Sequence, residues 1–286
     1  MRLSTLKSGL GAGIAFFASA AAAFADTALP IIGKPVDGAI GFQPAGTIVA
    51  RHIHGLEGMI TDIMFAIVVF VSLLLIFVMI RFNKKANPTP AKFTHNSPLE
   101  IAWTLIPIVI LVIIGAYSLP VLFLEEEIPT ADITVKVTGN QWFWSYAYKN
   151  EGIGFDSFML TEDKLKAAGY DDSEYRLAVD NPLVVPVGKT VVLQITGADV
   201  IHSWKVPAFG VMQDAVPGRV AESWFKADTP GIYFGQCSEL CGKDHAFMPI
   251  EVKVLSEDDY AKWLVAAKKL FASADAPAAP VQLASN

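Results

Sequence analysis

The stretch Cys237–Met248 reads CSELCGKDHAFM and lies between two segments that alternate apolar and polar residues, as β-strands do. It holds both cysteines of the chain, while another histidine, His202, lies upstream in the sequence VIHSW. Thiolate, imidazole and thioether groups together suit copper, with the thioether as a long, weak axial ligand. A mononuclear electron-transfer site needs only one cysteine, whereas two thiolates can each bridge two metals. The pattern therefore predicts a dinuclear copper site at the edge of a β-structure, with no open position for substrate chemistry.

Three other interpretations of these residues are open. Two cysteines in an exported protein commonly form a disulfide. A Cys2His2 zinc site would use the same cysteines and histidines, but it leaves Met248 without a role, and the separation of His202 from Cys237 is unlike that of a zinc finger. Ordinary packing is the third, since methionine is a common core residue. Only the copper interpretation accounts for all of these residues together.

The part of the chain before this domain is predicted to cross a membrane twice. Of the 286 residues, 53% are hydrophobic and 17% are charged, which is too apolar for an ordinary soluble protein. Ile63–Ile80 and Ile101–Leu124 are uncharged and long enough to span a bilayer core. We expect a helical hairpin over residues 59–124, with a basic loop at 82–98 that the positive-inside rule places in the cytoplasm. The C-terminal domain then lies in the periplasm.

The two ends of the chain have simpler signals. Residues 1–25 have a basic start, an Ala-rich apolar stretch and small residues before the predicted cleavage point, which is typical of a signal peptide. Residues 26–58 are expected to form a periplasmic N-terminal segment. Ser256 followed by three acids predicts the start of a C-terminal helix over 256–271. The Ala/Pro-rich residues 272–286 are expected to be disordered.

Residues 128–255 are predicted to form an all-β sandwich. Short alternating runs are separated by turn signals at the spacing typical of such folds. The predicted strands are Ile133–Thr138, Trp142–Tyr148, Arg176–Val179, Leu183–Val187, Thr190–Ile195, Glu222–Lys226, Gly231–Phe234 and Pro249–Val254. One short helix is expected at Thr161–Ala168. The ligand stretch falls between the last two strands, so a rigid sandwich edge would hold the metals.

The chain resembles subunit II of the haem–copper cytochrome c oxidases, in their bacterial form, over nearly its whole length after the signal peptide. The resemblance rests on CSELCGKDHAFMP, GNQWFWSY, VIHSW, DAVPGR and the two-span anchor. It implies a subunit of the bacterial inner membrane. The Greek-key cupredoxin sandwich of this subunit would bear the dinuclear copper A centre. Such a subunit takes electrons from ferrocytochrome c and passes them to haem a in subunit I. The implied partners are subunits I and III, and oxygen reduction and proton pumping belong to subunit I.

The resemblance also implies a role for each residue of the metal site. The two cysteines would bridge the coppers, and each histidine would bind one of them. A methionine thioether and the backbone carbonyl of Glu239 would be the axial ligands, while the Glu239 carboxylate would help hold a Mg²⁺ (or Mn²⁺) shared with subunit I. Asp214 in DAVPGR would lie near that ion. The residues matched to copper ligands are His202, Cys237, Glu239, Cys241, His245 and Met248.

Trp142 matches the exposed tryptophan at which electrons enter copper A domains of this family. Aromatic residues on a strand are more often core, and strand alternation puts Trp142 and Trp144 on one face and Phe143 on the other. Cytochrome c is typically basic, and the formal net charge of −6 agrees with an acidic docking face and not with a nucleic-acid partner. The residues expected to contact the cytochrome are Gln141, Phe143, Glu151, Asp156, Asp180 and Asp199.

Glu100 opens the second predicted span. An acid in the first helical turn is favoured by the helix dipole, and this alone would explain it. The resemblance implies instead that Glu100 marks the mouth of a proton path on the cytoplasmic side. The alternative function for the whole chain is a membrane-anchored copper carrier or metallochaperone without redox turnover. A quinol oxidase subunit II would lack the copper ligands, and nitrous oxide reductase lacks this two-span anchor.

Overall fold

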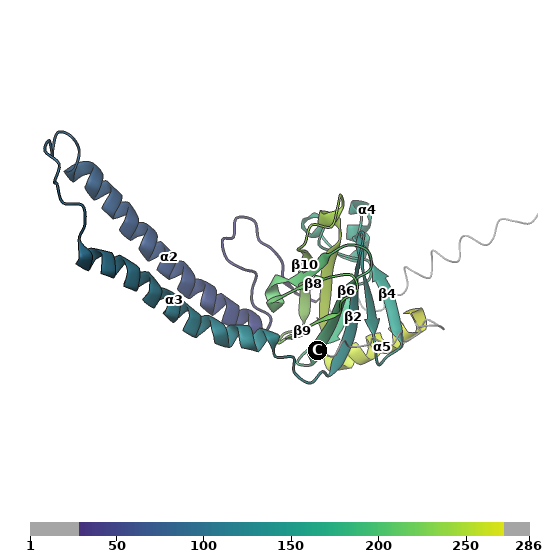
Figure 1. Ribbon diagram of the computed structural model, residues 1–286. Helices are drawn as coiled ribbons and strands as arrows, with labels where there is room; N and C mark the ends of the chain where they lie inside the picture. Colours follow the sequence, from purple (N-terminus) through teal and green to yellow (C-terminus); the bar gives the residue numbers. More distant parts are fainter. Residues whose placement is uncertain (1–28, 272–286) are drawn as a thin grey trace, which may run out of the picture. The chain divides into compact units, whose positions relative to one another are not determined.

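A computed structural model describes residues 29–271 and divides them into two units. One unit, Val49–Glu127, is a helical hairpin. The other joins residues 29–48 to residues 128–271 in a β-sandwich with a C-terminal helix (Figure 1). The predicted signal peptide and the predicted disordered tail lie outside the described residues. The predicted fold class, a two-helix hairpin followed by a β-sandwich and a short helix, is confirmed.

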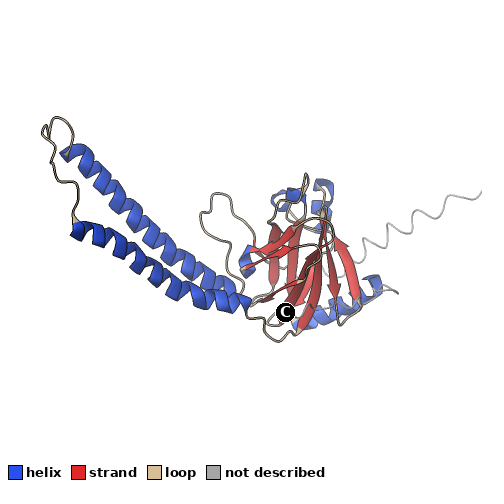
Figure 2. Ribbon diagram, viewed as in Figure 1, coloured by secondary structure: helices blue, strands red, loops and turns tan. Residues whose placement is uncertain are grey.

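The hairpin consists of α2 (Ile48–Arg81) and α3 (Ser97–Glu126), drawn as the two long blue helices in Figure 2. Both are long and apolar enough to cross a membrane, and almost none of their apolar stretch is buried within the protein. Helix α2 begins eleven residues before the predicted hairpin at 59–124, inside the segment expected to be periplasmic. The reason is that no proline lies between Ile48 and Arg81, so the helix extends toward the N-terminus beyond its apolar part.

A capping arrangement begins α3. The Asn96 side chain accepts a hydrogen bond from the Leu99 amide (3.2 Å), and Glu100 Oε1 accepts one from the Asn96 amide (3.1 Å). These reciprocal bonds satisfy amides that a helix start leaves without partners. Pro107 and Pro120 lie inside α3 without ending it.

Two sheets form the sandwich, shown in red in Figure 2. The first has the order β5-β11-β10-β7-β8, with β1 also paired to β10, and the second has the order β4-β3-β2-β6-β9. The strands of the first are β1 (Ile31–Gly33), β5 (Leu183–Pro186), β7 (His202–Val206), β8 (Val211–Ala215), β10 (Gly231–Cys237) and β11 (Pro249–Leu255). Those of the second are β2 (Ile133–Asn140), β3 (Phe143–Tyr148), β4 (Ile153–Ser157), β6 (Thr190–Gly197) and β9 (Ala221–Lys226).

Large aromatic side chains fill the space between the sheets. Trp144, Tyr146 and Trp204 are fully buried. Their polar atoms have partners, because Trp204 Nε1 donates to Tyr146 Oη (3.3 Å) and Trp144 Nε1 donates to the Met248 carbonyl (3.2 Å). The second of these bonds ties the core directly to the predicted ligand stretch. The core therefore positions the loop that follows β10.

A second, smaller core lies under the segment between β4 and β5. This segment contains α4 (Glu162–Leu165), η1 (Lys166–Ala168) and η2 (Asp172–Glu174), close to the predicted helix at Thr161–Ala168. Its apolar residues pack with Ile232 and Phe234 of β10. Two acids belong to this region: Glu174 pairs with Lys34 from the N-terminal segment, and the buried Glu251 accepts hydrogen bonds from Tyr170 and from the Val179 amide.

The C-terminal helix α5 (Glu257–Phe271) packs beside β4, β5 and β11. Trp263 contacts the Tyr148 ring at 5.5 Å between centres, and Phe271 contacts Phe155 at 5.0 Å. The Ser256 hydroxyl accepts a hydrogen bond from the Asp259 amide, as expected of the predicted N-cap.

The strand predictions are confirmed in seven of the eight runs, and the eighth is wrong. Arg176–Val179 forms a turn, in which the Leu177 amide donates to the Glu174 carbonyl, and only Val179 makes an isolated bridge, to Met159. Four short strands were not predicted: β1, β4, β7 and β8. They have three to five residues each, which is too short for an alternating pattern to be distinctive.

Candidate metal centre

The order of three strands brings the predicted ligands together. β10 is antiparallel to β7 and to β11, so the end of β10 meets the starts of those two strands. Cys237 is the last residue of β10, His202 is the first residue of β7, and Met248 directly precedes β11. The loop between β10 and β11 supplies the remaining residues, with His245 at the start of η4 (His245–Phe247). Residues 35 positions apart in the sequence thus share one end of the sandwich.

The potential donor atoms form two halves linked by the cysteines. In one half, Cys237 Sγ lies 4.0 Å from His202 Nδ1 and 3.3 Å from the Glu239 carbonyl oxygen. In the other, Cys241 Sγ lies 3.6 Å from His245 Nδ1 and 3.5 Å from Met248 Sδ.

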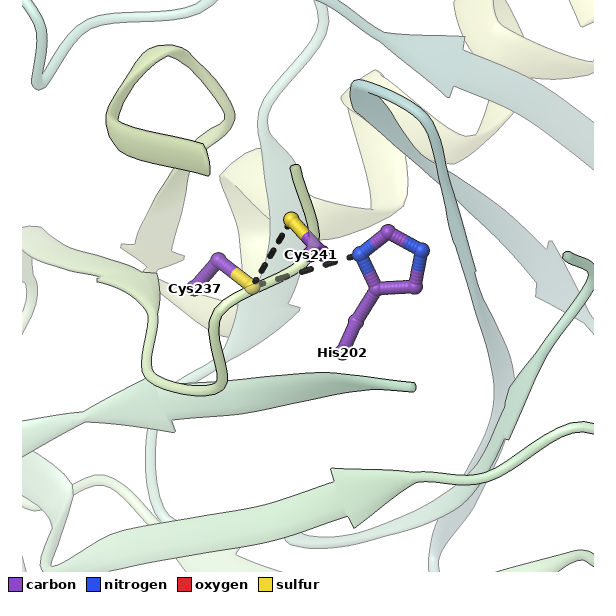
Figure 3. A group of neighbouring side chains, drawn as sticks. All are labelled: His202, Cys237 and Cys241. Atoms are coloured by element: carbon purple, nitrogen blue, oxygen red, sulfur yellow. Dashed lines mark hydrogen bonds between the residues drawn. The ribbon is translucent and has the colours of Figure 1, made fainter. Parts of the chain in front are cut away.

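The two sulfurs are 3.9 Å apart. Figure 3 draws this contact and the contact from Cys237 to His202 as dashed lines. Donors bound about 2.0–2.3 Å from a shared ion at tetrahedral angles lie roughly 3.3–3.8 Å from each other. The donor contacts of 3.3–4.0 Å are therefore close to the spacing of ligands that share a metal ion.

The thiols differ in their readiness to ionise. Burial raises the pKa of the Cys237 thiol, but its interaction with His202 and with backbone groups of Ser203 and Glu239 outweighs this and brings the pKa to about 7. For Cys241, burial and the neighbouring Cys237 thiolate act in the same direction and raise the pKa to about 12. A second thiolate in this site therefore requires compensating positive charge, which metal ions supply.

This geometry separates the alternatives. Both cysteines are free, and a sulfur–sulfur distance of 3.9 Å is far from the roughly 2.05 Å of a disulfide. A single tetrahedral zinc would take four donors, whereas six converge here. Met248 is buried as a packing residue would be, yet its sulfur faces Cys241. The donor set fits a pair of copper ions sharing two thiolates.

A hydrogen-bonded carboxylate supports one of the imidazoles. Asp199 Oδ1 accepts a hydrogen bond from His202 Nε2 (2.8 Å), which leaves Nδ1 directed toward Cys237. Asp199 Oδ2 accepts another from the Gln141 amide (2.8 Å). Such an outer partner fixes the ring orientation of a metal-binding histidine. Burial raises the pKa of Asp199, but its bonds to His202 and to the backbone outweigh this and lower it.

Trp142 is tied to the ligand loop through one carbonyl. Its Nε1 donates to the Cys241 carbonyl oxygen at 3.3 Å, and Gln141 Nε2 donates to the same oxygen at 2.8 Å. Trp142 is half-buried, whereas Trp144 belongs to the core, as is more common for an aromatic residue on a strand. The indole is therefore one hydrogen bond from the backbone of Cys241.

Two glycines allow close approach at the site. A Cβ on Gly139 would lie 2.8 Å from His202 Cδ2, and one on Gly242 would lie 3.0 Å from Trp142 Cζ2. Gly242 also has φ of +123°, a conformation that residues with side chains rarely adopt. Both positions thus keep space for the imidazole and the indole.

The predicted docking residues fall into two groups. Phe143 stacks on Phe158 at 4.5 Å, and Asp180 accepts a hydrogen bond from the Phe158 amide, so these residues lie together near the start of β3. Asp156 is on β4, opposite Ser145. Glu151 lies beyond the other end of β3, where it pairs with Lys268 of α5 (2.6 Å). The structure therefore does not bring Glu151 together with Trp142.

The remaining predicted site residues lie apart from the donor cluster. The Glu239 and Asp214 side chains are exposed. The amide of Ser238, next to Glu239, donates to the Ser203 carbonyl on β7, and Ser203 lies opposite Asp214 of β8. Glu100 belongs to the separate hairpin unit, where it caps α3.

Sequence reasoning missed several contributors. The sequence indicates Asp199 only as a docking acid, although its position three residues before His202 is a signal for a partner of that ring. Gly242 and Lys243 inside the ligand stretch, and Phe158 on the neighbouring segment, had no distinctive signal because their contacts to Trp142 and Phe143 arise only from folding.

Fold and site together define a class: a protein with two apolar helices and a β-sandwich whose edge carries two cysteine thiols, two imidazoles and a thioether. The family model described as the periplasmic domain of cytochrome c oxidase subunit II matches residues 133–255, and the model of its transmembrane domain matches residues 35–121. Cytochrome c oxidase subunit 2 of Cereibacter sphaeroides is 56% identical, covering 94% of this chain and 93% of that protein. A probable cytochrome c oxidase subunit 2 of Rickettsia bellii is 46% identical, covering 85% of this chain and 89% of that protein. Among solved structures, the periplasmic domain of subunit II of cytochrome oxidase from Bradyrhizobium japonicum is 53% identical, covering 50% of this chain and 99% of that chain, with a TM-score of 0.46.

The chain belongs to the cytochrome c oxidase subunit II family. It is thus a two-span inner-membrane subunit, with a periplasmic domain, of an oxidoreductase complex, and its role is to accept electrons for the oxidase. The predicted resemblance is confirmed, and the relatives give no support to the copper carrier. The cluster of His202, Cys237 and Cys241 is compatible with the copper A centre of the family.

Proposed function

We propose that this chain accepts one electron at a time from a cytochrome c at Trp142 and delivers it to a haem in subunit I through a dinuclear copper centre. The observation that carries the proposal is the convergence of six donor groups in two linked halves. The proposed ligands are His202, Cys237, Cys241, His245, Met248 and the carbonyl oxygen of Glu239. Bound there, two coppers sharing both thiolates would spread one electron over several atoms, so that little rearrangement accompanies transfer.

The protein's own part is to hold these donors rigidly and keep water out. Cys237 is 6% exposed and Met248 is 1% exposed, while His202 is fully buried. Asp199 holds the His202 ring through Nε2, and the core residue Trp144 holds the backbone at Met248. A preorganised ligand set lowers the reorganisation that accompanies each electron transfer, which suits a relay better than a carrier that must release its metal.

The exposure of Trp142 and its contact with the ligand loop support it as the electron acceptor. Its indole is partly exposed, and it is hydrogen-bonded to the Cys241 carbonyl, which leads in a few covalent bonds to a bridging sulfur. Beside it, the stacked pair Phe143 and Phe158 adds an apolar surface. We include Gln141, Asp156, Asp180 and Asp199 in the surface that meets the cytochrome, and leave Glu151 out because it lies at the other end of β3.

Two further proposals concern subunit I, with subunit III as the other partner. The exposed carboxylates of Glu239 and Asp214 are available to a Mg²⁺ (or Mn²⁺) shared with subunit I, a hard ion that suits oxygen ligands. Replacing Glu239 with Gln should remove this bound ion, measured by metal analysis, while the copper content stays the same. Retention of the ion would contradict the assignment.

Glu100 is proposed to accept protons at the cytoplasmic side, in addition to capping α3. Glu100→Gln keeps an oxygen for the Asn96 amide but removes the charge, so it separates the two roles. If Glu100 accepts protons, the Glu100→Gln oxidase should take up protons more slowly than the natural oxidase while its copper content stays the same. An unchanged uptake rate would leave only the helix cap.

The copper assignment is tested on the purified oxidase complex. We expect two coppers in this chain and a seven-line hyperfine pattern in the electron paramagnetic resonance spectrum, as one unpaired electron shared equally by two copper nuclei requires. Cys237→Ser and Cys241→Ser should each abolish that pattern. One copper with a four-line pattern, or a Cys237–Cys241 disulfide without copper, would overturn the proposal.

A matched pair of methionines provides the control. Met248→Leu keeps the volume of a buried side chain but removes the thioether beside Cys241, so the reduction potential and the hyperfine pattern should change. Met212→Leu makes the same substitution at a residue that is 56% exposed and lies outside the donor cluster. It should leave both properties as they are.

A further inference from the structure

Lys243 lies on the ligand loop between Cys241 and His245, and its ammonium group is positioned over the Trp142 ring. The nitrogen is 5.0 Å from the ring centre, within the range at which a cation is attracted by the face of an indole. We infer that Lys243 is a specificity-determining residue, which places a positive charge over the indole where electrons enter and so selects among reductants by their charge. This inference rests on the proposed function, with Trp142 as the electron acceptor.

The backbone fixes this position. Gly242, with its φ of +123°, brings the loop so close to the indole that a Cβ there would lie 3.0 Å from Trp142 Cζ2. The hydrogen bond from Trp142 Nε1 to the Cys241 carbonyl holds the ring on the same side. Lys243 follows directly in the chain, so its side chain begins next to the ring.

One positive and two negative side chains lie around the indole. The Lys243 ammonium is paired with Asp244 Oδ2 at 2.6 Å, and Asp199 lies on the neighbouring loop, bonded to the Gln141 amide. The Lys243 side chain is 76% exposed, whereas those of Asp244 and Asp199 are each 36% exposed. Lys243 therefore offsets two carboxylates at the surface that a reductant meets. Replacing it with Met changes the local charge by one unit, and replacing it with Glu changes it by two.

The positive charge of Lys243 affects how a reductant approaches Trp142 and takes no part in the electron transfer step. One electron leaves the reductant and is taken up by the centre beyond Trp142, and no bond to Lys243 forms or breaks. A cationic reductant is repelled by the ammonium, and an anionic one is attracted. Charges at the rim of a docking surface chiefly change the association rate and its dependence on salt.

The test compares reductants of opposite charge on the copper-loaded oxidase complex. With Lys243→Met at low ionic strength, we expect reduction by the hexaammineruthenium(II) cation to become about two- to five-fold faster, and reduction by ascorbate to become slower by a similar factor. Lys243→Glu should give larger changes in the same directions, and Lys243→Arg should behave like the natural protein. At about 1 M salt, where the screening length is roughly 3 Å, the differences should disappear. Binding of oxidised cytochrome c, measured without turnover, should tighten in Lys243→Met.

Lys262 provides a matched control. It is 72% exposed and pairs with Asp259 at 2.8 Å, but it lies on α5 beside Trp263, which contacts the far end of β3. Lys262→Met should change none of these rates. Equal rates in Lys243→Met and the natural protein for both reductants, or a change of the same sign for both, would overturn the inference.

A Trp142→Phe arm separates this inference from the function on which it rests. Loss of cytochrome c-driven reduction in Trp142→Phe together with unchanged rates in Lys243→Met overturns the role of Lys243 alone. Undiminished reduction by cytochrome c in Trp142→Phe overturns electron transfer through the indole. The copper content and spectrum of each variant are measured first, so that only proteins with an intact centre are compared.

Discussion

At the scale of single residues, the site depends on side chains that do not touch the metal position. Asp199 connects His202 to the Gln141 amide, and the same glutamine reaches the carbonyl of Cys241. A residue first interpreted as a surface charge therefore joins the ligand set to the segment that carries Trp142. Carboxylates in this position set both the orientation and the basicity of a ligating imidazole.

Asp199→Ala is expected to weaken copper binding roughly 10- to 100-fold, because His202 loses the partner that orients its ring. Asp199→Asn, which keeps one acceptor oxygen, should lose less. Competition with a chelator of known copper affinity measures the effect. Asp156→Ala is the control, since that exposed carboxylate bonds to Ser145 and to no ligand. Equal affinities in Asp199→Ala and Asp156→Ala would contradict the role of Asp199.

Gly242→Ala tests the close approach of the ligand loop to the indole. The new methyl group would meet Trp142 at 3.0 Å in a backbone conformation that already disfavours it, so we expect a loss of about 1–3 kcal/mol and slower electron transfer. Gly218 also has positive φ, +78°, but a Cβ there would meet open space. Gly218→Ala should therefore lose stability without slowing electron transfer. Denaturant unfolding and stopped-flow reduction distinguish the two variants.

At the scale of elements, the segment between β4 and β5 packs against the strand that ends at Cys237. Its polar contact with β11 is Glu251, which is fully buried and accepts hydrogen bonds from Tyr170 and from the Val179 amide (2.9 Å). Arg176 has φ of +68°, and its guanidinium carbon lies 5.0 Å from the centre of the Phe247 ring. Phe247 belongs to the ligand loop, between His245 and Met248 in the sequence. This segment therefore supports the ligand loop from outside the sandwich.

The buried Glu251 should make stability depend on pH. Burial raises its pKa above the ordinary 4.5, outweighing the effects of Lys253, Tyr170 and the Val179 amide. The contribution of protonated Glu251 to the free energy of unfolding is fully present below pH 4.5. It is lost as the pH rises through the raised pKa of the folded protein. Relative to Glu251→Gln, the natural protein should therefore lose unfolding free energy over that range, by at most about 1.4 kcal/mol per pH unit.

Chemical unfolding of the full chain at several pH values measures this slope. Glu222→Gln serves as the control, because that exposed carboxylate pairs with Gln194 on the surface. It should keep the slope of the natural protein. Parallel curves for Glu251→Gln and the natural protein would show that Glu251 has an ordinary pKa.

At the scale of the whole molecule, the chain divides into a hairpin and a sandwich, and the metal site belongs to the sandwich alone. Copper should therefore stabilise one unit and not the other. Binding to the native state at a thousand times the dissociation constant contributes about 4 kcal/mol. Removing copper with a chelator should lower the thermal midpoint of the sandwich, followed by near-ultraviolet circular dichroism, and leave the helical signal of the hairpin unchanged.

A Cys237→Ser, Cys241→Ser double variant is the control for copper removal, because it should unfold at the same temperature with and without added copper. A chelator that lowers the midpoint of this variant as much as that of the natural protein would show that copper stabilises the fold elsewhere. Equal shifts in both units would show that they unfold together.

The sequence by itself determined the features that depend on local pattern. The apolar runs predicted the two spans, alternation predicted seven strands, and the ligand stretch with VIHSW predicted which side chains suit copper. The predictions of spans and strands succeed because hydrophobic periodicity is a property of neighbouring residues. The choice of copper ligands rests on donor chemistry and stays a prediction. The start of α2 at Ile48 and the turn at Arg176–Val179 differ from prediction, because helix continuation and short turns leave weaker local signals.

Only the tertiary structure decided which distant residues meet. The pairing of β10 with both β7 and β11 brings His202, Cys237 and Met248 to one end of the sandwich. In the other sheet, the turn between β3 and β4 holds Glu151 at the end of β3 away from Trp142. The bond from Asp199 to His202, the Phe143–Phe158 stack and the position of Lys243 over the indole also result from folding. The physical reason is that strand order and loop path bring together segments separated by tens of residues, and no periodicity in the sequence records those contacts.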